Sequence, residues 1–339
     1  MPLYDTIKNF NKQFEYEPKV ENENALKRSD KFIVVGMGGS HLAADLIKAW
    51  KPDADLIVHS DYGLPQMHES SLKSYLVILS SYSGNTEEVL DAYSEAKKQG
   101  LAMAAVSVGG KLLELAKNDG IPYVQMPDAL VQPRFALGYS LKAILKLMGE
   151  EDALKELSGL AYSLDSKDYE TSGAALAGRL NGFVPVIYSS LRNFPVAYNW
   201  KIKFNETGKI PAFCNALPEL NHNEMTGFDP SPFADNNFGH NVQSAKGEGR
   251  KKMIELFYFL FLTDESDPAR IKKRMEVTDK LLRQRKFPVE LLKLEGKNVF
   301  EKIFFSLILA DWASFYLAQQ YEVEAEQVPM VEEFKKLIA

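Results

Sequence analysis

Short apolar runs alternate with amphipathic stretches from about Lys31 onward, and this alternation is the feature that most constrains the fold. The runs have the length and composition of buried strands, and the stretches between them have helical spacing. Continuous apolar strands separated by helices are typical of a parallel sheet that helices cover on both faces. In the first half we predict strands over 32–35, 55–60, 75–80, 102–108 and 122–125, and helices over 41–50, 87–99 and 111–118.

The second half begins with the same layout. We predict strands over 183–189, 254–262 and 289–294, and helices over 267–285 and 298–320. At the end of the first half, residues 135–163 are also predicted to be helical. Charged and small residues over 149–182 indicate a bridge between two domains, which a chain of 339 residues is long enough to form. We divide the chain into 1–155 and 156–339. The stretch 211–241 has no clean period and predicts a long functional loop.

Charge and cysteine content exclude several classes of protein. The net charge of −6 argues against a dedicated nucleic-acid binder, which needs clustered positive charge. The single cysteine, Cys214, excludes an intramolecular disulfide framework and a multi-cysteine metal site. The most apolar stretch, 299–318, is interrupted by Glu301, Lys302 and Asp311, so no membrane span is expected. The N-terminus lacks the layout of a signal peptide, and we expect a cytoplasmic protein.

The first motif, GMGGS at 36–40, follows a predicted strand and opens a predicted helix. Gly38, Gly39 and Ser40 would let backbone N–H groups at the helix N-terminus approach an anion. A dinucleotide fingerprint is the competing interpretation. It requires a small residue where His41 stands, although Asp61 lies where a ribose-binding acid would be expected. A tight turn without a ligand is the third possibility.

The second motif, SSYSGNT at 80–86, also lies between a strand and a helix. Ser81, Ser83 and Thr86 supply several short hydroxyl groups beside a helix N-terminus, which suits a phosphate monoester. Glu87 and Glu88 oppose an anion unless they point away from it. Because ligands of parallel sheets bind at the carboxyl ends of the strands, the two motifs together predict a phosphate site.

These two motifs resemble those of the sugar isomerase (SIS) domain family. Three further segments, PRFALGY at 133–139, FNE at 204–206 and PELNHNE at 218–224, are similar to the bifunctional phosphoglucose/phosphomannose isomerases, a branch with two SIS domains. The resemblance extends from about Lys31 to the C-terminus. It implies an α/β fold of two doubly wound parallel-sheet SIS (flavodoxin-like) domains.

The resemblance also implies roles for individual residues. Glu206 matches the family's catalytic base, His222, sixteen residues later, its ring-opening histidine, and Arg134 the arginine that faces the reacting carbons. Lys335 matches a C-terminal lysine near the sugar ring, although Lys336 fits the spacing nearly as well. The family's histidine reaches the neighbouring subunit's site, which implies a homodimer that shares its active sites, and the sequence does not specify which subunit donates His222.

Residue chemistry is compatible with these roles. A carboxylate partly withdrawn from water can carry a proton between two carbons, an imidazole exchanges protons near neutral pH, and a guanidinium stabilises an enediolate without losing its charge. Taken alone, Glu206 is more simply a solvated turn residue, and His222 a surface histidine. Two lysines at a helix end, Lys335 and Lys336, are usually only a favourable charge arrangement.

Metal ligation is not expected, because the five histidines form no His-x-x-x-His pair, and Asp235 and His240 are weak candidates. Cys214 and Ala216 depart from bulkier residues common in the family and would alter only a pocket wall. We therefore predict a metal- and cofactor-independent isomerase of hexose 6-phosphates, acting on glucose 6-phosphate and also on mannose 6-phosphate. The alternatives are an amino-sugar phosphate isomerase, a sugar-phosphate sensor without catalysis and a nicotinamide oxidoreductase.

Overall fold

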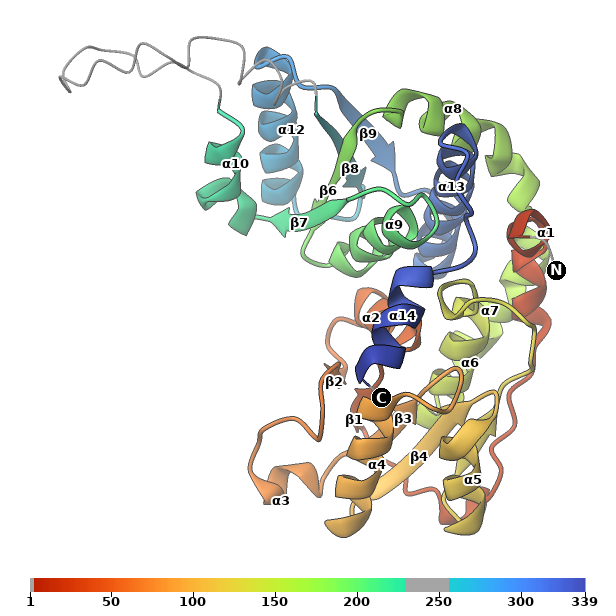
Figure 1. The fold of residues 1–339 in the computed structure, drawn as a ribbon. Coiled ribbons are helices and arrows are strands. Elements are labelled where there is room, and N and C mark those ends of the chain that lie inside the picture. The colour runs from red at the N-terminus through yellow and green to blue at the C-terminus, as the bar shows by residue number, and fades with distance from the viewer. Residues whose placement is uncertain (1–2, 230–255, 339) are drawn as a thin grey trace. The chain divides into compact units, whose positions relative to one another are not determined.

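The computed structural model describes residues 3–229 and 256–338, and the chain divides into two compact units (Figure 1). Unit 1 comprises Met1–Asp168 and Lys297–Phe304, and unit 2 comprises Tyr169–Gly296 and Phe305–Ala339. The division at Asp168 lies within the predicted bridge, 149–182. The division predicted after residue 155 falls inside helix α7 (Glu151–Ser163) of unit 1.

Unit 1 is built on a five-stranded parallel sheet with the order β2-β1-β3-β4-β5. This is the strand order of flavodoxin-like folds, and its direction reverses between β1 and β3. The strands are β1 (Lys31–Val35), β2 (Asp55–His59), β3 (Leu76–Ser80), β4 (Ala102–Ser107) and β5 (Tyr123–Gln125). The helices are α1 (Leu3–Lys8), α2 (Gly39–Trp50), α3 (Glu69–Leu72), α4 (Glu87–Lys98), α5 (Gly110–Asn118), α6 (Leu137–Met148) and α7.

Helices cover both faces of this sheet because its central strands are apolar throughout. On one face, Ile33 and Val77 pack with Val89 of α4 and Leu112 of α5. On the other face α2 contacts β1, α6 contacts β4, and the two helices pack against each other. Every residue of β3 is buried as a result. The predicted parallel sheet is confirmed for this unit.

Unit 2 has a four-stranded parallel sheet with the order β7-β6-β8-β9, which is the order of unit 1 without a fifth strand. Its strands are β6 (Val184–Ser190), β7 (Phe213–Leu217), β8 (Phe257–Thr263) and β9 (Val289–Lys293). Its helices are α8 (Glu170–Leu180), α9 (Phe194–Glu206), α10 (Glu224–Gly227), α12 (Ala269–Gln284), α13 (Val299–Gln320), of which residues 299–304 belong to unit 1, and α14 (Pro329–Ile338). The predicted fold class is therefore confirmed for both units.

Several elements of unit 2 were not predicted, among them α8, which lies within the predicted bridge 149–182. Helix α9 was not predicted because two buried polar residues, Asn199 and Lys203, interrupt its apolar face. The prediction of an irregular segment over 211–241 is wrong for the part that the structure describes, which contains β7, the short helix η5 (Glu219–His222) and α10. Residues 230–241 lie outside the described residues.

In the part of the chain that the structure describes, no helix is both long and apolar enough to cross a membrane.

Candidate functional site

The glycine motif joins β1 to α2 at the carboxyl edge of the first sheet. Gly38 is exposed, with a φ of +51°, and precedes α2 as its N-cap residue. At Gly39 the helix lies directly against the short helix η3 (Pro133–Phe135), since an added Cβ would stand 2.6 Å from the carbonyl carbon of Pro133 and 2.8 Å from the amide nitrogen of Arg134. The fold therefore brings the first motif and the Arg134 segment together.

The hydroxyl motif joins β3 to α4 at the same edge of the sheet. Ser81 is fully buried, and its Oγ lies 2.8 Å from Thr86 Oγ1 and accepts a hydrogen bond of 3.0 Å from Gly84 N. Gly84 has a φ of +73°, and a Cβ there would stand 1.8 Å from the carbonyl oxygen of Gly109. Only glycine fits this position, so the loop has one tightly fixed shape.

Ser40 connects the two motifs. Its Oγ accepts a hydrogen bond of 3.0 Å from Tyr82 N, and its carbonyl oxygen accepts one of 3.1 Å from Ser80 Oγ. The two loops lie side by side at the carboxyl ends of β1 and β3, where the strand order reverses and ligands of such sheets bind. Ser83 is exposed on this surface and Thr86 is half-buried, so hydroxyl groups are accessible there.

The acidic residues at the start of α4 contact the segment that follows β2. Asp91 Oδ2 accepts a hydrogen bond of 2.9 Å from Gly63 N. Burial, followed by the charges of Glu87 and Glu88, raises the pKa of Tyr62, which keeps its hydroxyl group protonated. Part of the acidic surface of α4 is thus used to hold a neighbouring loop.

Arg134 lies in η3 and is only 2% exposed. Its guanidinium stands over the Phe135 ring, 4.8 Å from the ring centroid, in a cation–π contact. A guanidinium remains charged at every pH at which proteins fold. Unit 1 therefore holds a buried permanent positive charge next to the first motif.

Glu206 is the last residue of α9 in unit 2 and is half-buried. Its carbonyl oxygen accepts a hydrogen bond of 2.6 Å from Lys209 Nζ. One turn earlier, Lys203 Nζ donates to Asp311 Oδ1 of α13 at 2.5 Å, and both side chains are almost fully buried. This ion pair, which fixes the last turn of α9, was not predicted, although charges within apolar helical stretches could have indicated it.

His222 ends η5, immediately after β7, and its side chain is exposed. Within residues 3–229 and 256–338 it makes no hydrogen bond or ion pair. Helix α9 and strand β7 lie side by side in Figure 1, and Glu206 is the last residue of α9 whereas His222 follows β7 in η5. In the chain the two residues are therefore separated by a strand that is about 13 Å long.

Lys335 lies in the last turn of α14, where it is exposed and donates to Glu332 Oε1 at 2.8 Å. Lys336 is also exposed. Lys209 Nζ, which donates to the carbonyl oxygen of Glu206, also donates to that of Gln327, so α14 starts close to the end of α9.

The second sheet also reverses its strand order, between β6 and β8, but that point carries different chemistry. Asp264 and Asp267 follow β8 and are buried there, and Asn193 Nδ2 donates to Asp264 Oδ2 at 3.3 Å and to Asp267 Oδ1 at 3.5 Å. A phosphate placed here would meet two carboxylates. Of the two equivalent points, only that of unit 1 has the chemistry of a phosphate site.

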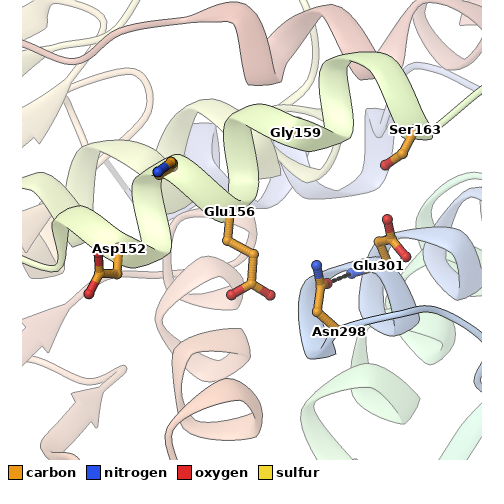
Figure 2. A pocket seen from close by; sticks show the side chains of 7 residues that line it. Asp152, Glu156, Gly159, Ser163, Asn298 and Glu301 are labelled. Atoms are coloured by element: carbon orange, nitrogen blue, oxygen red, sulfur yellow. Dashed lines mark hydrogen bonds between the residues drawn. The ribbon is translucent and has the colours of Figure 1, made fainter.

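A cavity of about 390 Å³ lies elsewhere in unit 1, between α7 and the start of α13 (Figure 2). Burial and the neighbouring Glu301 carboxylate raise the pKa of Glu156, and Asp152 adds a third acidic side chain. Three carboxylates against one lysine, Lys155, disfavour a phosphate there, and the cavity shares no residue with the two motifs. The cavity is therefore not a candidate for the sugar-phosphate site.

Among the described residues, no group of three or more His, Cys, Asp or Glu side chains could hold a metal ion. The weak metal candidates Asp235 and His240 lie outside the described residues.

Known proteins resemble this chain over its whole length. The family model described as the C-terminal SIS domain of bacterial phospho-glucose isomerase matches residues 170–338. A bifunctional phosphoglucose/phosphomannose isomerase from Aquifex aeolicus is 32% identical over 343 residues, which cover 98% of this chain and 97% of that protein. A D-glucosamine-6-phosphate 4-epimerase from Sulfolobus acidocaldarius is 26% identical, with 98% of this chain and 96% of that protein covered.

Solved structures agree with the fold. A protein from Thermotoga maritima described as glucosamine-6-phosphate deaminase has a TM-score of 0.62 at 15% identity, with 96% of each chain covered.

Proposed function

The chain belongs to the family of bifunctional phosphoglucose/phosphomannose isomerases, and on this premise we propose that it interconverts glucose 6-phosphate and mannose 6-phosphate with fructose 6-phosphate. The observation that carries the proposal is the pair of joined loops at the switch point of unit 1, with the buried Arg134 beside them. Hydroxyl groups, a helix N-terminus and a fixed positive charge suit a sugar phosphate better than a neutral sugar.

In the proposed reaction the substrate's phosphate binds the two loops. Ser83 and Thr86 are the accessible hydroxyl donors. The buried Ser81 stabilises the loop through its contact with the Thr86 hydroxyl. The backbone N–H groups of Gly38 and Gly39 at the start of α2 add to the binding. The N–H of Ser40 donates to the carbonyl oxygen of Met37 at 3.0 Å and is not available for this contact. No metal or cofactor is required for this step.

The chemistry then proceeds at the first two carbons of the sugar. His222, with Lys335 as an assisting group, opens the pyranose ring by moving a proton from the C1 hydroxyl to the ring oxygen. Glu206 removes the C2 proton, Arg134 stabilises the cis-enediolate while the hydroxyl proton passes from O2 to O1, and Glu206 returns the proton to C1. With mannose 6-phosphate, rotation about C2–C3 presents the other face of C2 to the same base.

The proposed active unit is a homodimer in which His222 acts in the site of the partner copy. The separation of Glu206 and His222 by the length of β7 supports this proposal, and so does the exposure of His222. A mixture of Glu206→Gln and His222→Ala chains, reassembled at equal concentration, should regain about a quarter of the wild-type turnover, since half the dimers then hold one intact site. No recovery above the single variants would refute a shared site.

A coupled assay for fructose 6-phosphate tests the function, with glucose 6-phosphate and mannose 6-phosphate as separate substrates in the presence of EDTA. We expect activity on both, and a loss of at least about 10³-fold in Glu206→Gln, because the amide cannot accept the proton. Glu276→Gln, an exposed glutamate on α12, is the matched control. Activity on glucose 6-phosphate alone would restrict the enzyme to one substrate, and activity lost on chelation would contradict a metal-free mechanism.

Erythrose 4-phosphate tests the role of His222. Its only ring-forming hydroxyl carries the phosphate, so this substrate needs no ring opening. We expect His222→Ala to lose turnover on glucose 6-phosphate and to keep it on erythrose 4-phosphate. Equal losses on both would refute the ring-opening role.

An amino-sugar phosphate reaction is the second candidate, since the relative from Sulfolobus acidocaldarius covers nearly the whole chain. Incubation with glucosamine 6-phosphate, followed by NMR of the products, distinguishes the two. Turnover of the amino sugar without turnover of either hexose phosphate would favour this candidate.

A further inference from the structure

We propose that Glu224 is a positioning residue for His222: its carboxylate holds the segment that carries the histidine against strands β6 and β7. This inference rests on the proposed ring-opening role of His222. It assigns a function to the last residue of the PELNHNE segment, which the reaction outlined above does not use.

The carboxylate of Glu224 receives two donors from adjacent strands. Tyr188 Oη of β6 donates to Oε1 at 2.7 Å, and Asn215 Nδ2 of β7 donates to Oε2. Tyr188 and Asn215 are opposite each other in the parallel register, so both side chains leave the same face of the sheet. Hydrogen bonds to an ionised carboxylate are about twice as strong as neutral ones.

Tyr188 is a rigid anchor for this contact. It is 1% exposed, and its ring packs against Phe259 and Phe261 with centroids 5.5 and 5.4 Å away. Burial, together with the hydrogen bond to Glu224, raises the pKa of Tyr188 far above its ordinary value. The hydroxyl therefore remains a donor at any pH at which the enzyme works.

The residues on the other side of His222 are also fixed. Leu220 is fully buried, and Asn221 donates from Nδ2 to Thr278 Oγ1 at 2.9 Å while its Oδ1 accepts from Arg274 Nη1 at 3.2 Å. His222 thus lies between two anchored points, with its own side chain exposed. Without Glu224, the contacts of Leu220 and Asn221 would remain close to the histidine, together with the hydrogen bond of 2.8 Å from Asn223 Nδ2 to Glu219 Oε1 within the same segment.

Phe228 packs at the far end of α10 against Phe257, Phe259 and Phe287, with centroid distances of 5.3, 4.9 and 5.8 Å. This cluster keeps the segment folded when Glu224 is changed. A substitution at Glu224 should therefore loosen the backbone near His222 without unfolding unit 2.

The test compares Glu224→Gln and Tyr188→Phe with Glu290→Gln. Glu290, on β9 at the opposite edge of the sheet from β7, is the control: it likewise accepts a hydrogen bond from a tyrosine, Tyr258 Oη at 3.0 Å, and it also pairs with Arg179. Its substitution therefore removes at least as many contacts, at a distance from the segment. We expect both test variants to lose at least about tenfold in kcat on glucose 6-phosphate and to keep their activity on erythrose 4-phosphate. The control should retain both activities.

A double-mutant cycle separates positioning from a general structural role. If Glu224 acts through His222, Glu224→Gln should cause less than about a twofold further loss in a His222→Ala background. A full tenfold further loss there, or unchanged kcat in the single variant, would overturn the proposal.

Amide hydrogen exchange over 219–228 gives a readout that needs no activity. Faster exchange in Glu224→Gln than in Glu290→Gln is expected. Equal exchange would refute the proposal that Glu224 holds the segment, even if the enzyme proved inactive on both hexose phosphates. An inactive wild-type protein with this exchange difference would instead refute only the proposed function.

Discussion

Gly39→Ala is expected to displace Arg134, because the backbone around the arginine occupies the place where a Cβ atom would stand. That atom would lie 2.6 Å from the carbonyl carbon of Pro133 and 2.8 Å from the amide nitrogen of Arg134. Favourable contacts between heavy atoms begin near about 3.5 Å, so the two backbones must separate by roughly 0.7 to 0.9 Å.

The size of the effect follows from this displacement. A shift of about 1 Å in a positioned catalytic group can lower the rate by about 10²-fold, so we expect kcat on glucose 6-phosphate to fall between about 10- and 100-fold. Overpacking costs about 1–3 kcal/mol of unfolding free energy, which lowers Tm by about 3 to 9 °C for a unit of this size.

Gly178→Ala in α8 is the matched control, because a Cβ at that position meets nothing within 4 Å. Alanine is the better helix former, and we expect this variant to gain up to about 1 kcal/mol with unchanged kcat. The coupled fructose 6-phosphate assay and thermal unfolding followed by circular dichroism measure both variants. A folded Gly39→Ala protein with wild-type kcat would refute the dependence of Arg134 on this close contact.

Three further outcomes are expected. Lys203→Met removes the ammonium partner of the buried Asp311 carboxylate and should lower the free energy of unfolding in urea by about 3–5 kcal/mol, most of which the additional Asp311→Leu substitution should restore. A double variant as unstable as the single one would contradict the ion-pair argument. Burial raises the pKa of Cys214 to about 11, so alkylation of this thiol by iodoacetamide at pH 8 should be about 100-fold slower in the native protein than in urea. The native rate should increase as the pH rises toward 11, and equal rates in the two conditions would show an accessible thiolate. Ser83→Ala should raise KM for glucose 6-phosphate about tenfold with kcat within twofold, while Ser94→Ala, on the outer surface of α4, should change neither; an unchanged KM would remove Ser83 from the phosphate site.

The sheet of unit 1 could be predicted from the sequence because its strands are buried on both faces. Such strands are continuous apolar runs, and all five lie within two residues of their predicted bounds. Strand β7 could not be predicted in the same way. It is an edge strand that carries Asn215, and its first residue, Phe213, is 57% exposed, so it lacks both the apolar run and the alternation that indicate a strand.

The residue types of the candidate site could be predicted, but their arrangement could not. Glycines and hydroxyl groups after two strands indicate an anion site because helix N-termini follow them. The contact of Gly39 with the Arg134 segment joins residues far apart in the chain, and no local pattern specifies it. Likewise, a spacing of sixteen positions from Glu206 to His222 does not indicate that a strand lies between them.

The two units use one strand order for different purposes, and this difference bears on the assembly. Unit 1 presents hydroxyl groups at its switch point, where a phosphate can bind. Unit 2 fills the equivalent point with Asp264 and Asp267, so its candidate groups lie at the two ends of an edge strand instead. The strand β7 lies in the chain between Glu206 and the segment that carries His222. This arrangement agrees with the proposal that a second copy of the chain supplies His222, which the mixture of Glu206→Gln and His222→Ala chains tests.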